Sequence, residues 1–249
     1  MKIAVVSDIH GNLPALEDIE RRGADKIICL GDMIGKGPSS VEVIDLCRQH
    51  CDLIVRGNWE DWLYKNYCAQ REGRENDVDT RSGWYLNALK SPDIEYLGLL
   101  PHSTEMLLSG KLVRMFHAHP VDFTRYFQDS PMEQLWELFR CGVDMLIPRE
   151  SDIVIYGDIH TSYMHYMLPL DGRLLVNAGS VGNPMDTPQT DYVLLEGAEN
   201  CETPGPFSIQ FVRIPYDIDR AVELARSTDL PNKEGYIMEI TTAKYFIRG

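Results

Sequence analysis

The sequence predicts an α/β fold in which parallel strands alternate with helices. Five short apolar runs recur along the chain, and helix-like segments lie between the first three. Strand, helix, strand, helix, strand is the signature of parallel βαβ units. The 249 residues are 44% hydrophobic and 25% charged, which is typical of a globular protein. No linker or repeat divides them, so we expect a single domain over residues 1–249.

The five predicted strands share one feature, because each runs into a side chain that can bind a metal ion. Glycine stands immediately before that side chain in three of them. The strands and the side chains that follow them are residues 3–6 with Asp8 and His10, 26–30 with Asp32, 52–56 with Asn58, 112–116 with His117, and 152–156 with Asp158 and His160.

Two helices are expected between the early strands. Residues 14–22 begin with Pro14, which suits a first helical turn. Residues 39–49 open with Ser39 and Glu42 in the spacing of a capping box. Further amphipathic helices are expected at 132–141 and 217–226, and later strands at 174–176, 192–195 and 209–214.

The carboxyl ends of parallel strands share one edge of a sheet, so the seven polar side chains are expected to meet there. The alternative is that each is only a cap or turn residue. The set offers oxygen and nitrogen donors but no thiolate, which suits Mn, Fe, Zn or Co at a site that is not a structural zinc knot. Seven ligands are too many for one ion. The sequence therefore predicts two divalent ions, which can clamp a phosphoryl group and hold an activated water between them.

Composition excludes some partners. A net charge of −14 argues against binding long nucleic acid through its phosphates. No apolar stretch is long enough to span a membrane, and no signal-peptide pattern is present, so we expect no membrane association and a cytoplasmic location. The six cysteines form no CxxC motif and are expected to be reduced.

The motifs SDIHGN, LGDMIGKGP, VRGNWED, FHAHP, GDIH and NAGSVGNP, in this order, resemble the calcineurin-like metallophosphoesterase superfamily, especially its small bacterial and archaeal single-domain members. The resemblance implies a four-layer α-β-β-α sandwich with two mixed sheets and the metal site at the carboxyl ends of the strands. The late strands fit the second sheet. The resemblance also implies one metal held by Asp8, His10 and His160, another held by Asn58, His117 and Asp158, and Asp32 as the bridge.

The activity implied by the resemblance is hydrolysis of a phosphodiester, phosphomonoester or pyrophosphate bond. A metal-bridging hydroxide would attack phosphorus in line, and Asp32 would hold the two ions together. We expect a small phosphorylated substrate of nucleotide type. The alternatives are a phosphoprotein phosphatase and a weakly active metal-binding scaffold with the same fold.

Trp59 departs from the family pattern, because many relatives carry a histidine there that contacts phosphate or protonates the leaving oxygen. Indole cannot act as an acid or base. One interpretation is that Trp59 shields the site or packs on Trp62, and the other is that it offers a stacking face for a nucleobase. The candidates for a replacement acid are His119, Glu60 and Asp61, and His119 is also a candidate for an outer position around the metals. Arg56 and Asn58 are candidates for contact with the substrate.

Asp158 is the second departure, because relatives usually carry histidine at this position. A third carboxylate is a harder donor, so it favours Mn or Fe over Zn at the second metal position. Residues 62–101 read as helices broken by the polar run 71–81, and we expect them to form a cap-like insertion.

Overall fold

The computed structural model describes residues 1–17, 23–74, 78–140, 142–168 and 172–246, and in it two mixed five-stranded sheets pack face to face. In the first sheet the strands follow the order β10-β9-β1-β2-β3. The strand β1 pairs in parallel with β2, and β2 with β3, while β9 pairs antiparallel with both β1 and β10. These strands are β1 Lys2–Val6, β2 Lys26–Cys29, β3 Leu53–Ile54, β9 Thr190–Glu196 and β10 Ser208–Ile214.

The second sheet has the order β4-β5-β6-β8-β7. Its three central strands, β5, β6 and β8, are parallel, and the edge strands β4 and β7 run antiparallel to them. The bounds are β4 Ser103–Leu108, β5 Lys111–Phe116, β6 Ile153–Tyr156, β7 Tyr163–Met167 and β8 Arg173–Asn177.

The prediction that the late strands belong to the second sheet was wrong for two of them. Residues 174–176 lie in the second sheet as expected, but β9 and β10 extend the first sheet, where Leu195 pairs with Ile3 and with Ile209. An apolar run shows that a strand is buried and does not reveal its neighbour. Two edge strands, β4 and β7, were not predicted, because their mixed sequences STEMLL and YMHYM lack a clear apolar run.

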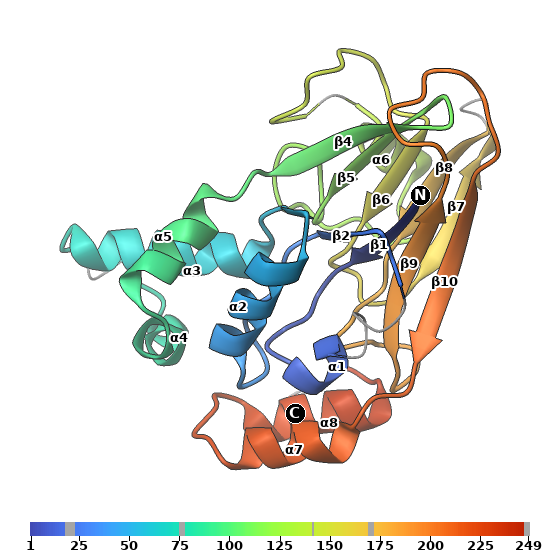
Figure 1. Cartoon of the computed structure of the whole chain (residues 1–249). Coiled ribbons are helices and arrows are strands. Elements are labelled where there is room, and N and C mark those ends of the chain that lie inside the picture. Colours follow the sequence, from blue (N-terminus) through green and yellow to red (C-terminus); the bar gives the residue numbers. More distant parts are fainter. Residues whose placement is uncertain (18–22, 75–77, 141, 169–171, 247–249) are drawn as a thin grey trace.

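The helices mostly match the predictions in position and differ in length. The helix expected at 14–22 is observed as Leu13–Glu17, and residues 18–22 lie outside the described part of the chain. Three helices lie within or next to the predicted insertion 62–101, and they extend to the left of the sheets in Figure 1. Their action as a cap stays a prediction. The helices are α1 Leu13–Glu17, α2 Ser40–His50, α3 Asn58–Arg71, α4 Gly83–Ala88, α5 Ser91–Leu99, α6 Met132–Glu137, α7 Ile218–Arg226 and α8 Lys233–Thr242, with a 3₁₀ turn at Thr80–Ser82.

Alternation along the strands builds three apolar cores and so a four-layer α/β sandwich. Ile3 and Val5 of β1 face the space between the sheets, whereas Ala4 and Val6 pack against the helices on the outer face of the first sheet. Leu135 of α6 packs in a third core on the outer face of the second sheet. In Figure 1, α7 and α8 lie below α1 at the foot of the first sheet. Among the described residues, no helix is both long and apolar enough to cross a membrane.

Candidate metal centre

The predicted ligands lie at the carboxyl ends of β1, β2, β3, β5 and β6, on turns with unusual backbone geometry. Five of them have φ in the left-handed region, at 53° for Asp8, 50° for His10, 51° for Asp32, 65° for Asp158 and 63° for His160. Residues with a Cβ adopt this region rarely, at a cost of about 1–3 kcal/mol each, and they do so mostly at functional sites. The fold therefore uses strain to turn these side chains toward one point.

The three ligand histidines are oriented in the same way. The Nδ1 atoms of His10, His117 and His160 lie 3.2, 2.8 and 2.6 Å from the backbone carbonyls of Ile34, Leu30 and Asn183. A carbonyl can only accept a hydrogen bond, so each Nδ1 carries the proton and each Nε2 presents its lone pair to the centre. Metal-binding histidines are held by this arrangement.

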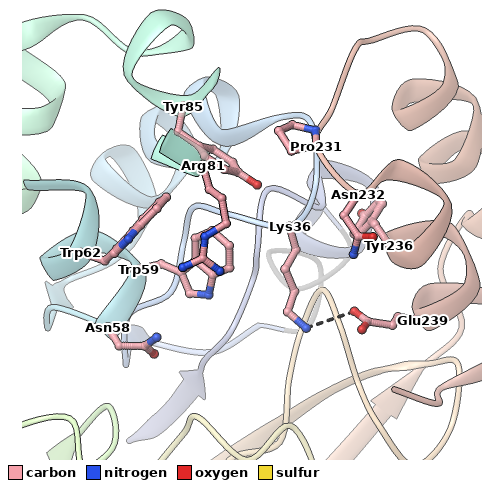
Figure 2. Close-up of a pocket in the computed structure, with 10 residues that line it drawn as sticks. All are labelled: Lys36, Asn58, Trp59, Trp62, Arg81, Tyr85, Pro231, Asn232, Tyr236 and Glu239. Carbon is pink, nitrogen blue, oxygen red and sulfur yellow. Dashed lines mark hydrogen bonds and ion pairs between the residues drawn. The ribbon is translucent and has the colours of Figure 1, made fainter. Parts of the chain in front are cut away.

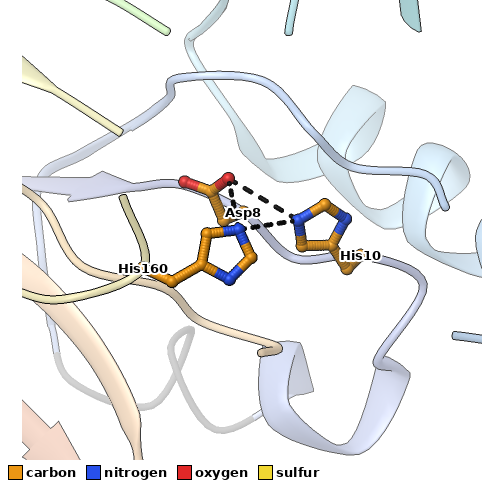
Figure 3. A group of neighbouring side chains, drawn as sticks. All are labelled: Asp8, His10 and His160. Carbon is orange, nitrogen blue, oxygen red and sulfur yellow. Dashed lines mark hydrogen bonds and ion pairs between the residues drawn. The ribbon is translucent and has the colours of Figure 1, made fainter. Parts of the chain in front are cut away.

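The ligand atoms converge on two overlapping groups, which are Asp8 with His10 and His160, and Asp8 with Asp32 and His117. In the first group, drawn in Figure 3, Asp8 Oδ1 lies 3.6 Å from His10 Nε2 and 3.2 Å from His160 Nε2. In the second, Asp32 Oδ2 lies 3.4 Å from His117 Nε2, and it is also 3.6 Å from His10 Nε2. The carboxylates of Asp8 and Asp32 thus face both groups.

The arrangement fits bound cations, because buried acceptors face one another at its centre. The Nε2 atoms of His10 and His160 lie 3.1 Å apart, and Asn58 Oδ1 lies 2.8 Å from His117 Nε2. Asp8 Oδ1 is buried without a hydrogen-bond donor. Lone pairs at such distances repel unless a proton or a metal ion lies between them. The donors are carboxylate oxygen, amide oxygen and imidazole nitrogen, which suit a divalent transition metal.

The pKa values show that the centre stabilises positive charge. Burial alone would raise the pKa of Asp8, but the nearby imidazoles of His160 and His117 hold it well below its usual range. Burial alone would lower the pKa of His117, but Asp32 and Asp8 raise it well above its usual range. Burial does lower the pKa of His10.

Asp158 differs from the other carboxylates because Arg125 binds it in a bidentate ion pair. Arg125 Nε lies 2.6 Å from Oδ2 and Nη2 lies 2.6 Å from Oδ1, while His117 Nε2 is 3.7 Å from Oδ1. Burial would raise the pKa of Asp158, but its hydrogen bonds with Arg125 and His117 lower it to about 2. Asp158 belongs to neither group of converging ligand atoms among the described residues. Its predicted role as a metal ligand stays a prediction.

The buried carboxylate of Glu60 holds the turn that carries Asp32 in place. The Glu60 carboxylate accepts hydrogen bonds from the backbone N–H groups of Asp32, Met33, Ile34 and Gly57. This geometry places Glu60, a predicted acid, under the turn that carries Asp32.

Glycine precedes three of the ligands because the backbones and side chains come very close there. A Cβ on Gly57 would collide with Asp32 Oδ1, and a Cβ on Gly157 would collide with Ser7 Oγ. The glycines seen in the sequence before Asn58 and Asp158 are therefore required by the packing of the ligand turns.

A pocket of about 660 Å³ opens beside the metal centre and shares Asn58 with it (Figure 2). Its aromatic wall comes from α3 and α4, and the opposite side comes from α8. Lys36 lies between them, with Nζ 2.6 Å from Asn183 Oδ1 and 3.1 Å from Glu239 Oε2. The lining residues are Lys36, Asn58, Trp59, Trp62, Arg81, Tyr85, Pro231, Asn232, Tyr236 and Glu239.

Trp59 connects the pocket to the centre. Its backbone N–H donates to Asp32 Oδ1 at 2.9 Å, and its ring meets those of Trp62, Tyr85 and His10 edge-on at centroid distances of 5.4, 5.6 and 5.9 Å. The contact with Trp62 was one of the two sequence-based alternatives. The side chain also lines the pocket, so the other alternative, stacking on a substrate base, stays open as a prediction.

The remaining residues predicted to act in the site lie at the margins of the metal centre. Arg56 Nη1 donates to the Gly98 carbonyl and lies 3.8 Å from Asp61, while Asp61 pairs with Lys65 on α3. The ring of His119 packs against Tyr126, with Nδ1 3.2 Å from Asp122 and Nε2 4.0 Å from Glu137. Their predicted roles as substrate contact and acid stay predictions.

Sequence reasoning assigned no role to Lys36, Arg81, Arg125, Tyr85, Tyr236 or Glu239, all of which lie at the pocket or the centre. The motif LGDMIGKGP contains Lys36, and its flanking glycines were the available signal. The approach of Arg125 to Asp158 spans 33 residues and left no pattern in the sequence.

The chain is similar to known proteins in sequence and in fold. The sequence model of the calcineurin-like phosphoesterase superfamily domain matches residues 1–200. The uncharacterised protein MJ0912 of Methanocaldococcus jannaschii is 30% identical over 253 residues, which cover 92% of this chain and 93% of that protein.

Two solved structures share the fold. The crystal structure of a metallophosphoesterase from Sphaerobacter thermophilus has a TM-score of 0.74 at 23% identity and covers 98% of this chain and 100% of that one. The hypothetical protein PH1004 of Pyrococcus horikoshii OT3 has a TM-score of 0.73 at 17% identity and covers 98% of this chain and 99% of that one.

Proposed function

This chain belongs to the calcineurin-like phosphoesterase superfamily and is a hydrolase of phosphate esters, and on that basis we propose that it uses two divalent ions to cleave a small substrate that carries an aromatic group. The observation that carries the binuclear proposal is the pair of overlapping ligand groups, because Asp8 and Asp32 face both. Manganese or iron is the expected metal at the second position.

The chain's own residues have clear parts in such a reaction. Asp32 spans the two groups and fixes their separation, and the backbone N–H of Trp59 holds one of its oxygens. The Nδ1–H bonds to backbone carbonyls hold the three imidazole rings so that each Nε2 faces the centre. Divalent ions bound here would supply positive charge to the phosphoryl oxygens and lower the pKa of the attacking water. Lys36, in an ion pair with Glu239, places an ammonium group on the pocket side.

The pocket supports a small substrate. Trp59, Trp62 and Tyr85 give it an aromatic wall, and Lys36 and Arg81 give it cations. A phosphate at Asn58 would leave the aromatic wall to a planar group such as a nucleobase, since stacking on aromatic side chains is tolerant of the base. A pocket of about 660 Å³ is within the range of small-molecule sites, which favours such a substrate over a phosphoprotein.

The test is hydrolysis of bis-p-nitrophenyl phosphate by metal-free protein after addition of Mn, Ni, Co, Mg or Zn. We expect activity that depends on added metal and that falls at least a hundredfold in Asp32→Asn. The matched control, Asp45→Asn, removes an exposed carboxylate on α2 and should keep full activity. Turnover that is independent of metal, or equal in Asp32→Asn, contradicts the proposal.

The same assay separates the alternative functions. A phosphoserine peptide offered beside bis-p-nitrophenyl phosphate and a dinucleotide would be the best substrate of a phosphoprotein phosphatase. A scaffold would bind metal with little turnover of any of the three.

A further inference from the structure

The ion pair between Arg125 and Asp158 lies where the second metal position is expected. Both oxygens of Asp158 are engaged, Oδ2 by Nε and Oδ1 by Nη2, each at 2.6 Å. The Asp158 side chain is only 4% exposed, whereas that of Arg125 is 43% exposed. The guanidinium therefore reaches a buried carboxylate from the solvent side.

The chain contains the tripeptide Asp-Ile-His twice at the centre, and the two aspartates differ in the groups that contact their carboxylates. In both copies, Asp8 to His10 and Asp158 to His160, the aspartate and the histidine have left-handed φ values between 50° and 65°. Asp8 presents Oδ1 to the imidazoles without any donor, as an open ligand does. Asp158 has the same backbone geometry, but a cation of the protein already covers its carboxylate.

A second ion at His117 would compete with this cation. The Asp158 oxygen nearest to His117 Nε2, at 3.7 Å, is Oδ1, and Oδ1 is also the acceptor for Arg125 Nη2. A divalent ion that used Oδ1 would lie next to a guanidinium, and like charges at such a distance repel. The ion can gain Asp158 only if Arg125 swings away.

We propose that Arg125 is a residue that sets metal stoichiometry, because it competes with the second divalent ion for Asp158. The first ion, at Asp8, His10 and His160, binds without this competition. The second ion binds more weakly because it must displace Arg125. This inference rests on the proposed metal centre.

The test is a titration of metal-free protein with Mn²⁺, followed by calorimetry and by metal analysis after equilibrium dialysis. We compare the wild type with Arg125→Gln, which keeps a polar side chain but loses the charge. The wild type should bind one ion tightly and a second more weakly. In Arg125→Gln the second ion should bind at least tenfold more tightly, while the affinity for the first changes less than threefold.

Two further variants sharpen the test. Arg149→Gln is the matched control, because it removes an exposed arginine from a pair with Asp152 at 3.1 Å, and both affinities should stay as in the wild type. Asp158→Asn should lower the affinity for the second ion, both as a single variant and in combination with Arg125→Gln. Thermal unfolding without metal verifies that each variant is folded.

The outcomes separate this inference from the proposed function. If Arg125→Gln binds the second ion with unchanged or lower affinity, Arg125 does not compete with that ion and instead positions Asp158. Absence of any bound Mn²⁺ in the wild type overturns the metal centre itself.

Discussion

Replacing Glu60 by glutamine should lower the stability of the protein and its affinity for metal ions. On this account Glu60 supports the Asp32 turn and is not a catalytic acid. Both carboxylate oxygens accept two backbone N–H groups, Oε1 from Met33 and Ile34 and Oε2 from Asp32 and Gly57. In either orientation, glutamine turns an NH₂ group toward one of these pairs. Two buried donors then lose their acceptor, at about 1–3 kcal/mol each, or about 2–6 kcal/mol in total.

One effect opposes this loss. Burial and the neighbouring Asp32 raise the pKa of Glu60 to about 7, so glutamine also removes a carboxylate that burial disfavours. We therefore expect the lower part of the range, about 2–3 kcal/mol, as the loss in free energy of unfolding.

The assay is urea unfolding of metal-free protein, with Glu42→Gln as the control, because Glu42 is exposed in the first turn of α2. The affinity for Mn²⁺ should fall together with the stability of Glu60→Gln, because the same turn holds Asp32. A change below about 0.5 kcal/mol, the usual effect of a surface substitution, with activity lost at unchanged metal affinity would refute this reasoning and return Glu60 to the role of an acid.

Three other perturbations test separate parts of the structure. Trp59→Ala should raise KM for a dinucleotide by roughly tenfold to a hundredfold, with a smaller effect on bis-p-nitrophenyl phosphate; equal effects would indicate shielding instead of stacking. Burial raises the pKa of Asp191 to about 6, above its unfolded value, so this group's contribution to stability is present below about pH 4 and is lost as the pH rises through 6. Relative to the wild type, Asp191→Asn should therefore gain about 3 kcal/mol in free energy of unfolding between pH 4 and pH 8, and a gain that does not vary with pH would contradict this. Asp32→Asn should lose most of the rise in Tm that Mn²⁺ causes in the wild type, and a rise equal to that of Asp45→Asn would remove Asp32 from the centre.

The convergence of the ligands could be predicted because it follows from local rules. Asp8, Asp32 and His117 each stand one or two residues after a short apolar run, and parallel strands end at one edge of a sheet. The glycines before Asn58 and Asp158 were visible as well. Their physical reason, the collision of a Cβ with Asp32 or Ser7, needed the packed turns.

The features that escaped prediction depend on contacts distant in sequence. Nothing in the apolar runs at 192–195 and 209–214 distinguishes one sheet from the other, so their pairing beside β1 required the folded chain. The helix α8 brings Tyr236 and Glu239 to the pocket from a segment where no element was predicted.

Arg125 shows the same limit at the site itself. The family resemblance implied Asp158 as a ligand of the second metal. The guanidinium that covers this carboxylate comes from the segment between β5 and α6, which carries no regular pattern. The charge around the second position is therefore less negative than a count of ligands suggests.

The most direct test of the metal centre is the anomalous difference map of a crystal soaked in Mn²⁺, recorded near the manganese absorption edge. Two peaks about 3.5–4 Å apart are expected, one beside Asp8, His10 and His160 and the other beside Asn58 and His117, with Asp32 between them. A map with a single peak, or with none among these residues, would contradict a binuclear centre.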